Sequence, residues 1–155
     1  MLARYEPLGI RNQSGVTIVP VVGAADYTTL TGFKATLEGA NSEANGFVLS
    51  PRTLDAVENT PASDGHFITP PSSIADISRL ATTSVPVNLG IGLNESEVYA
   101  GDFRDLLIGM RVRFELRRLN ERYADEGKVA LRARIRADVQ LAHGASFVVG
   151  TGVTN

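Results

Sequence analysis

The chain has 155 residues, of which 43% are hydrophobic and 21% are charged, and its formal net charge is −2. This composition excludes wholesale disorder, and the length predicts one structural unit over residues 1–155. The absence of cysteine excludes a disulfide framework, a cysteine-ligated zinc site and thiol catalysis.

Positive and negative charges are unevenly distributed along the chain. Residues 1–102 hold 5 basic and 11 acidic side chains, whereas residues 103–155 hold 10 basic and 6 acidic side chains. Such an asymmetry is typical of a nucleic-acid-binding face or of a surface that docks head-to-tail on a copy of the same chain. Simple scatter of surface charges is the third interpretation.

The first half of the sequence predicts a strand and a helix. Residues 8–23 are predicted to be extended chain with a polar turn at 12–15, because β-branched residues dominate and the residues from Val16 to Val22 alternate. Asp26 is a suitable N-cap for a helix over about 27–38, in which Leu30, Phe33 and Leu37 share one face.

A second strand and helix follow at residues 46–58. Residues 46–49 form a short apolar strand, after which Ser50 can cap a helix that has Pro51 at its first position, where the missing N–H costs nothing. Residues 59–73 contain three prolines and few apolar anchors, so we predict a long, projecting and mobile loop there.

From residue 82 onwards the pattern is that of β-strands. Short strands are predicted at 84–87, 97–100, 106–108 and 146–149, and a longer one at 110–119. The longest alternation runs over 128–141. There the odd-numbered residues from Val129 to Leu141 are apolar, while Arg132, Arg134 and Arg136 face the other way.

The two long strands are predicted to pair as a hairpin across residues 120–127. A shared apolar face then requires the following pairs: Leu116 opposite Leu131, Phe114 opposite Ala133, Arg113 opposite Arg134 and Arg111 opposite Arg136. Like charges directly opposite each other are destabilising. We therefore expect carboxylates to face these arginines, either from the acidic part of a neighbouring subunit or from within the chain, Glu115 included.

The sequence contains no constellation typical of catalysis. His66 and His143 are far apart, and His143 has no serine at a spacing that suggests a nucleophile and its base. The acidic cluster of Glu95, Glu97, Asp102 and Asp105 is interpreted as solvated turn carboxylates. No catalytic, metal-ligating or cofactor-binding residue is predicted, and the protein is not expected to be an enzyme or to take a small-molecule substrate. No segment is long and apolar enough to predict a membrane span.

Four segments, in this order, resemble the C-terminal half of tailed-bacteriophage major capsid proteins of the Hong Kong 97 fold. They cover nearly the whole chain, and their residues are EPLGIRN at 6–12 with VTIV at 16–19, GFVLSPR at 46–52, VYAGDF at 98–103 with LIGMR at 107–111, and VALRARIRAD at 129–138 with HGASFV at 143–148.

This resemblance implies an α+β fold with a mixed β-sheet, two main helices and a long β-hairpin. Residues of about 18–122 would be axial-domain-like, and residues 1–17 and 123–155 would supply peripheral-domain-like strands. The implied protein is a structural subunit of an icosahedral phage or prophage capsid. It would be made in the bacterial cytoplasm and located in the virion. Its partners would be copies of itself in pentamers and hexamers and other capsid proteins, and it would meet packaged DNA only indirectly.

Within that picture, two surfaces are candidate functional sites. Arg111, Arg113, Arg132, Arg134 and Arg136 are expected at a subunit interface. Asp64, Gly65, His66 and Phe67 are expected in a loop at the capsomer axis.

Family members carry an N-terminal arm, an extended loop and a spine helix ahead of this region. We therefore expect this chain to be a fragment, a truncated prophage remnant or a designed piece, and to be a monomer or at most a weak small oligomer. Lys34 and Lys128 are the only lysines, and crosslinking between subunits is not expected. Two alternatives are a shell protein of an encapsulin-like nanocompartment and an arginine-faced nucleic-acid-binding module.

Overall fold

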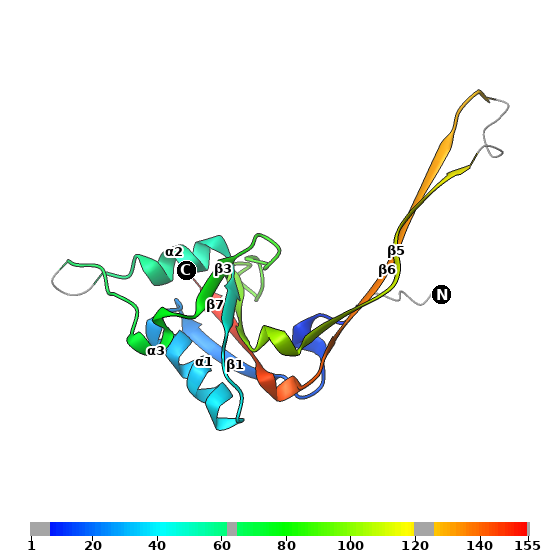
Figure 1. Cartoon of the computed structure of the whole chain (residues 1–155). Coiled ribbons are helices and arrows are strands. Elements are labelled where there is room, and N and C mark those ends of the chain that lie inside the picture. The colour runs from blue at the N-terminus through cyan, green and yellow to red at the C-terminus, as the bar shows by residue number, and fades with distance from the viewer. Residues whose placement is uncertain (1–6, 62–64, 120–125, 155) are drawn as a thin grey trace.

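The computed structural model describes residues 7–61, 65–119 and 126–154. These residues form a globule from which a long two-stranded arm projects (Figure 1). The globule is built on a five-stranded sheet with the order β1-β7-β4-β2-β3. Its strands are β1 (Thr17–Gly23), β2 (Gly46–Leu49), β3 (Ser78–Ala81), β4 (Glu95–Gly101) and β7 (Phe147–Thr154).

The sheet is mixed, as predicted. β1 pairs with β7 in parallel, and β2 pairs with β3 in parallel. β4 lies in the middle and is antiparallel to both β2 and β7. The α+β class with a mixed sheet, two main helices and a long hairpin is therefore confirmed.

Both main helices begin where their caps were predicted. In α1 (Tyr27–Gly39), the carboxylate of Asp26 accepts the N–H of Thr29 at 2.7 Å. In α2 (Pro51–Glu58), the hydroxyl of Ser50 accepts the N–H of Thr53 at 3.2 Å. Each cap satisfies a backbone donor that has no partner inside the helix.

The core lies between the helices and one face of the sheet. Leu30, Phe33 and Leu37 of α1 are buried at 0–2% exposure, which confirms the predicted helix face. They pack in one cluster with residues of the sheet and of α2, among them Phe47, Leu49, Val57, Val98, Ala100, Val148 and Val153.

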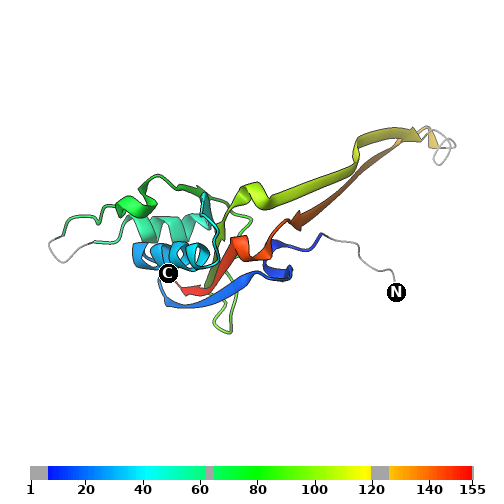
Figure 2. The same ribbon diagram turned by 60° about the horizontal axis from the view of Figure 1, so that its bottom comes forward.

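The opposite face of the sheet is covered by segments without a long helix. The short 3-10 turn η1 (Ile10–Asn12) and the loop that precedes β4 lie on that side, away from α1 and α2 (Figure 2). Glu97 of β4 is only 2% exposed there, and it accepts hydrogen bonds from the guanidinium of Arg11 and the hydroxyl of Tyr99. A buried carboxylate needs such partners to offset its lost hydration.

The arm consists of β5 (Leu106–Leu119) and β6 (Ala130–Leu141), which pair antiparallel in a sheet of their own. The 3-10 turns η2 (Phe103–Asp105) and η4 (Gly144–Ser146) connect the arm to β4 and β7. The separate strand predicted at 106–108 is the root of β5, because Gly109 stays in the ladder opposite Asp138.

Two sequence-based predictions in the middle of the chain are wrong. Residues 84–87 form no strand. Val85 instead donates its N–H to the carbonyl of Thr82 in a turn, and Pro86 has no N–H to give to a ladder. The predicted loop at 59–73 ends in a one-turn helix, α3 (Ser72–Ala75), and β3 follows it unpredicted. Four residues at a sheet edge are too short a run to show a period of two.

We expect Gly150→Ala to destabilise the globule by about 1–3 kcal/mol, because a methyl group there would meet the buried ring of Phe33 at 2.3 Å. The control is Gly32→Ala in α1, where a methyl group meets nothing within 4 Å and helix propensity improves by up to about 1 kcal/mol. Urea unfolding of both variants measures the difference. Equal stability of the two variants would contradict the close packing at Gly150.

Candidate assembly surface

The arm exposes an apolar face along its length. Successive residues of β6 alternate between two faces, and each residue of β5 shares a face with the residue paired to it. The apolar residues of this face are Leu106, Ile108, Met110 and Leu116 of β5 and Leu131, Ala133, Ile135, Ala137, Val139 and Leu141 of β6, and Arg118 lies on the same face opposite Leu131. Its largest side chains are 55–67% exposed at Ile108, Met110, Leu116, Leu131 and Ile135. A contiguous exposed apolar surface of this kind marks an interaction site.

The register of the arm differs from the prediction beyond its root. Near the root it is the predicted one, with Met110 opposite Ala137. Two irregularities between Met110 and Glu115 then insert extra residues into β5, so that Leu116 lies opposite Ala133 rather than Leu131. Val112 consequently shares a face with Arg136 and not with Leu116.

The same two irregularities change which charges face each other. Glu115, rather than Arg113, lies opposite Arg134, and Val112, rather than Arg111, lies opposite Arg136. The predicted Phe114–Ala133 pair is also absent. One like-charge pair that was not predicted does form, between Arg117 and Arg132.

Glu115 joins two arginines of the charged face. Its carboxylate accepts from Arg134 Nη2 at 2.7 Å and from Arg117 Nε at 2.6 Å. These two hydrogen bonds, that of Arg134 foremost, hold the pKa of the Glu115 carboxyl below its usual value. The expectation that Glu115 would supply a carboxylate to the arginines from within the chain is confirmed.

Five other arginines of the arm form no ion pair with any residue that the structure describes. They are all exposed: Arg111, Arg113, Arg118, Arg132 and Arg136. Within the described residues, the arm together with residues 126–129 holds 8 basic and 3 acidic side chains, and the globule holds 5 basic and 10 acidic ones. The arm is thus a basic extension of an acidic body.

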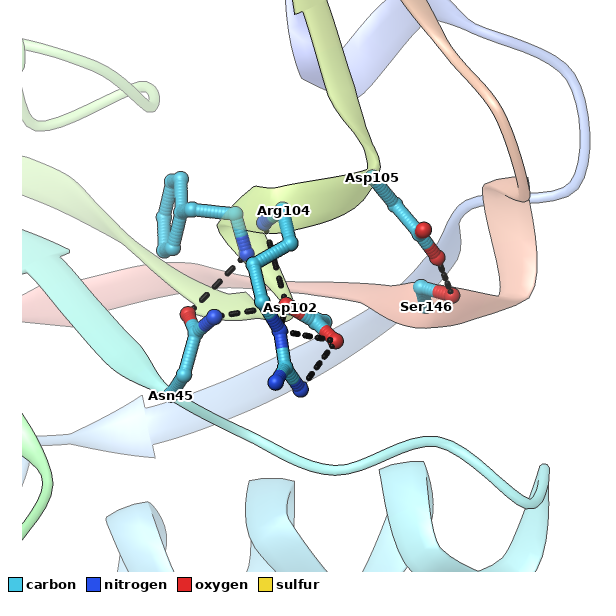
Figure 3. A network of polar contacts seen from close by, with 6 residues as sticks. Asn45, Asp102, Arg104, Asp105 and Ser146 are labelled. Atoms are coloured by element: carbon cyan, nitrogen blue, oxygen red, sulfur yellow. Dashed lines mark hydrogen bonds and ion pairs between the residues drawn. The ribbon is translucent and has the colours of Figure 1, made fainter.

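The root of the arm is fixed to the globule by a network of short polar contacts (Figure 3). Asp102 accepts from Arg104 Nη2 at 2.7 Å and from Asn45 Nδ2 at 2.6 Å, while Asn45 Oδ1 accepts the N–H of Phe103 at 3.0 Å. On the other strand, the Ser146 hydroxyl donates to Asp105 at 2.6 Å. Both connections between globule and arm are therefore tied to side chains at the edge of the sheet.

An aromatic contact adds to this network. The rings of Phe103 and Phe147 meet edge to face with centroids 5.5 Å apart. Such pairs contribute about 0.5–1.5 kcal/mol beyond their buried area. The sequence pattern gave no signal for Asn45 or for this ring pair, because their partners lie more than 40 residues away in the chain.

The loop expected at the capsomer axis lies at the end of the globule far from the arm (Figure 1). Gly65 has a positive φ of 83°, and Phe67 is 67% exposed. His66 is exposed as well, and Asp64 lies outside the described residues. Phe67 forms an isolated bridge with Pro61, and the N–H of Ile68 donates to Thr60 at 3.2 Å, so the two ends of the loop are joined at its base.

In the described part of the globule, Ser146 and His143 do not form a nucleophile–base pair. Ser146 donates its hydroxyl hydrogen to Asp105 and not to His143. Among the residues that the structure describes, no three histidine or acidic side chains gather in a way that could hold a metal ion. In the same part of the chain, no helix has the length and hydropathy to cross a membrane.

The sequence model of the phage capsid family matches residues 3–152, and the chain belongs to this family. No curated protein sequence matches the chain.

Solved structures agree with this assignment at the level of the fold. The chain is similar to a structure from Gordonia phage Cozz, with a TM-score of 0.69 and 17% identity over 100% of this chain and 54% of that one. A structure from Mycobacterium phage Adephagia gives a TM-score of 0.67 and 14% identity over 99% and 56% of the two chains. The holo-SrpI encapsulin complex from Synechococcus elongatus PCC 7942 gives a TM-score of 0.62 and 15% identity over 89% of this chain and 53% of that one. The chain thus spans little more than half the length of these proteins.

We expect the root of the arm to weaken at acid pH. The hydrogen bond from Arg104 lowers the pKa of the Asp102 carboxyl below its usual value of 3.8. A carboxyl whose pKa is lower in the folded state stabilises fully above its unfolded pKa, and the contribution is lost as the pH falls through the folded pKa. The midpoint temperature of thermal unfolding of the wild type should therefore fall as the pH is lowered below 3.8.

The matched variant is Asp102→Asn, which removes this titration. It should be less stable than the wild type at neutral pH, and the difference should shrink as the pH is lowered from about 6 to about 2. Thermal unfolding followed by circular dichroism over this pH range measures the stability difference and its dependence on pH. A difference that is constant with pH would show that the Asp102 charge does not stabilise the root.

Proposed function

We propose that this chain is the shell-building part of a bacteriophage or prophage capsid subunit, and that it acts by packing against copies of itself and not by catalysis. The observation that carries the proposal is the arm, on which an apolar face and arginines that form no ion pair within the described residues are exposed together. Family membership supports the same role.

In this proposal the globule is the axial domain and the arm belongs to the peripheral domain. The change between them falls at residues 105/106 and 141/142, where η2 and β6 end, whereas the sequence-based boundary at 122/123 lies outside the described residues. The loop with Gly65, His66 and Phe67 would then point towards the symmetry axis of pentamers and hexamers. Other capsid proteins are further partners, the packaged DNA is met only indirectly, and the chain is made in the bacterial cytoplasm.

The arginines of the arm are proposed to meet carboxylates of a neighbouring subunit. Arg134 is already neutralised by Glu115, so it supports the arm itself. Arg132 and Arg136 lie on the same face and have no acidic partner among the described residues. The acidic surface of the next globule complements them, and this complementarity favours a head-to-tail arrangement of subunits.

We expect the double variant Arg132→Glu and Arg136→Glu to weaken association of full-length subunits roughly tenfold, since each surface ion pair contributes up to about 1 kcal/mol. The control is Lys34→Glu with Glu38→Lys, which exchanges the two charges of an ion pair on α1 and leaves the net charge unchanged. Sedimentation velocity at low salt measures both. Unchanged association of the arm variant would exclude these arginines from the interface.

The apolar face of the arm is tested separately by Ile135→Asp. Ile135 is 62% exposed, so the isolated chain should keep its stability to within about 0.5 kcal/mol. In full-length subunits the same change should prevent closed shells, because it places a charge where an apolar partner would bury it. Urea unfolding and negative-stain microscopy measure the two effects, and intact shells with the variant would contradict the assigned role.

A nucleic-acid-binding module is the second candidate, supported by the five exposed arginines of the arm that form no ion pair with a described residue. If the arm bound DNA, the logarithm of the affinity would fall linearly with the logarithm of the salt concentration, in proportion to the phosphates contacted. Fluorescence anisotropy with duplex DNA at about 50 and about 200 mM salt tests this. Shell formation without DNA would favour the capsid role, or the related role in a nanocompartment shell.

A further inference from the structure

The N-terminal turn, residues 10–15, lies in the angle between the sheet and the root of the arm (Figures 1 and 2). It precedes β1 in the chain and belongs to neither strand of the arm. It nevertheless contacts the sheet, β6 and the turn that returns from the arm, and each contact uses a different residue.

The contact with the sheet is an ion pair. Arg11 donates to Glu97, which is 2% exposed and also accepts the hydroxyl of Tyr99. Burial, followed by the hydrogen bond to Glu97, raises the pKa of the Tyr99 phenol above its usual value, so the phenol stays a donor. The turn is thus anchored to β4 through a carboxylate that cannot be hydrated by bulk water.

The contact with the arm is made by a single side-chain amide. Gln13 Nε2 donates to the carbonyl of Val139 at 3.1 Å, and Gln13 Oε1 accepts the N–H of Leu141 at 2.8 Å. Val139 and Leu141 are two residues apart on β6. The Gln13 amide therefore hydrogen-bonds the backbone of β6 in the way that a residue of a neighbouring third strand would. A third bond, from Gln13 Nε2 to the carbonyl of Leu8 at 3.3 Å, ties the side chain to its own segment.

The contact with the returning turn is backbone against backbone. A methyl group on Gly144 in η4 would meet the carbonyl oxygen of Ser14 at 2.2 Å and Gly15 Cα at 2.9 Å. Gly15 has a φ of +87°, a conformation in which other residues are strained. The approach of residues 14–15 to η4 therefore depends on two glycines.

We propose that the N-terminal turn is a bracket that sets the direction of the arm relative to the sheet, with Gln13 and Gly144 as its positioning residues. Arg11 holds the bracket to the globule, and Gln13 and Gly144 hold it to the two sides of the root. That the arm direction in turn sets the angle between neighbouring subunits rests on the proposed function. The bracket itself is a property of the single chain.

The experiment measures the distance between globule and arm by double electron–electron resonance. The chain has no cysteine, so nitroxide labels can be placed at Ala35→Cys on α1 and Ala133→Cys on β6, both exposed. Gln13→Ala should broaden the distance distribution at least twofold, because the arm loses both bonds to the bracket. Gly144→Ala should shift its mean, because the methyl group separates η4 from the turn.

Two further variants separate positioning from general stability. Asn12→Ala removes an exposed side chain of the same turn that makes no hydrogen bond among the described residues, and it should leave the distribution unchanged. Gln13→Glu keeps the acceptor for Leu141 but loses the donor to Val139, so its distribution should be of intermediate width. The thermal midpoint of the globule should be the same in Gln13→Ala and Asn12→Ala.

A distribution for Gln13→Ala as narrow as that of the wild type would overturn the proposal, and so would equal broadening by Asn12→Ala. The Gln13→Ala and Asn12→Ala results decide the proposal, because the clash in Gly144→Ala can prevent that variant from folding. A shifted mean distance in a folded Gly144→Ala variant adds support. Shell formation by full-length subunits is measured separately, so a failure of the capsid role and a failure of the bracket give different results.

Discussion

A two-stranded antiparallel ribbon has no second layer on which to bury its side chains, and this constraint governs the structure of the chain. An isolated hairpin is at best marginally stable in water. The arm of β5 and β6 nevertheless extends away from the globule with large aliphatic side chains 55–67% exposed on one face. Its root must therefore be held by the globule, and in the proposed function its apolar face is completed by another surface.

The root meets the first of these requirements with side chains rather than with a continuous sheet. Asn45 and Asp102 fix the outgoing strand, and Ser146 with Asp105 fixes the returning one. Gln13 supplies two hydrogen bonds to β6 in place of a third strand. Each of these contacts joins residues that are distant in the chain, so the orientation of the arm is a property of the folded globule.

The second requirement connects the arm to its proposed role in a shell. The two irregularities in β5 place Glu115 beside Arg134 and Arg117, which neutralises the middle of the charged face. Arg132 and Arg136 have no acidic partner in the described part of the chain, and in the proposed function the excess of acidic side chains on the globule gives a second copy the complementary charge. An arm that carries both an apolar and a basic face suits assembly between identical subunits better than it suits a free monomer.

The sequence by itself determined the features that depend on neighbouring residues. Asp26 and Ser50-Pro51 located both main helices, since capping is a contact over three residues. The strict alternation of β6 assigned its apolar and arginine faces, and the absence of cysteine and of nucleophile–base pairs excluded several chemistries. The order of four short motifs indicated the capsid family, which the family match confirmed.

Only the tertiary structure decided the register of the arm and the position of its root. Extra residues in β5 leave no trace in its own alternation, so Val112 and Leu116 were expected on one face and lie on two. β3 at the edge of the sheet was missed because four residues are stabilised there by pairing with β2 and not by their own pattern. The role of Gln13 could not be predicted, because its partners on β6 are 126 and 128 residues further along the chain and only folding brings them within hydrogen-bond distance.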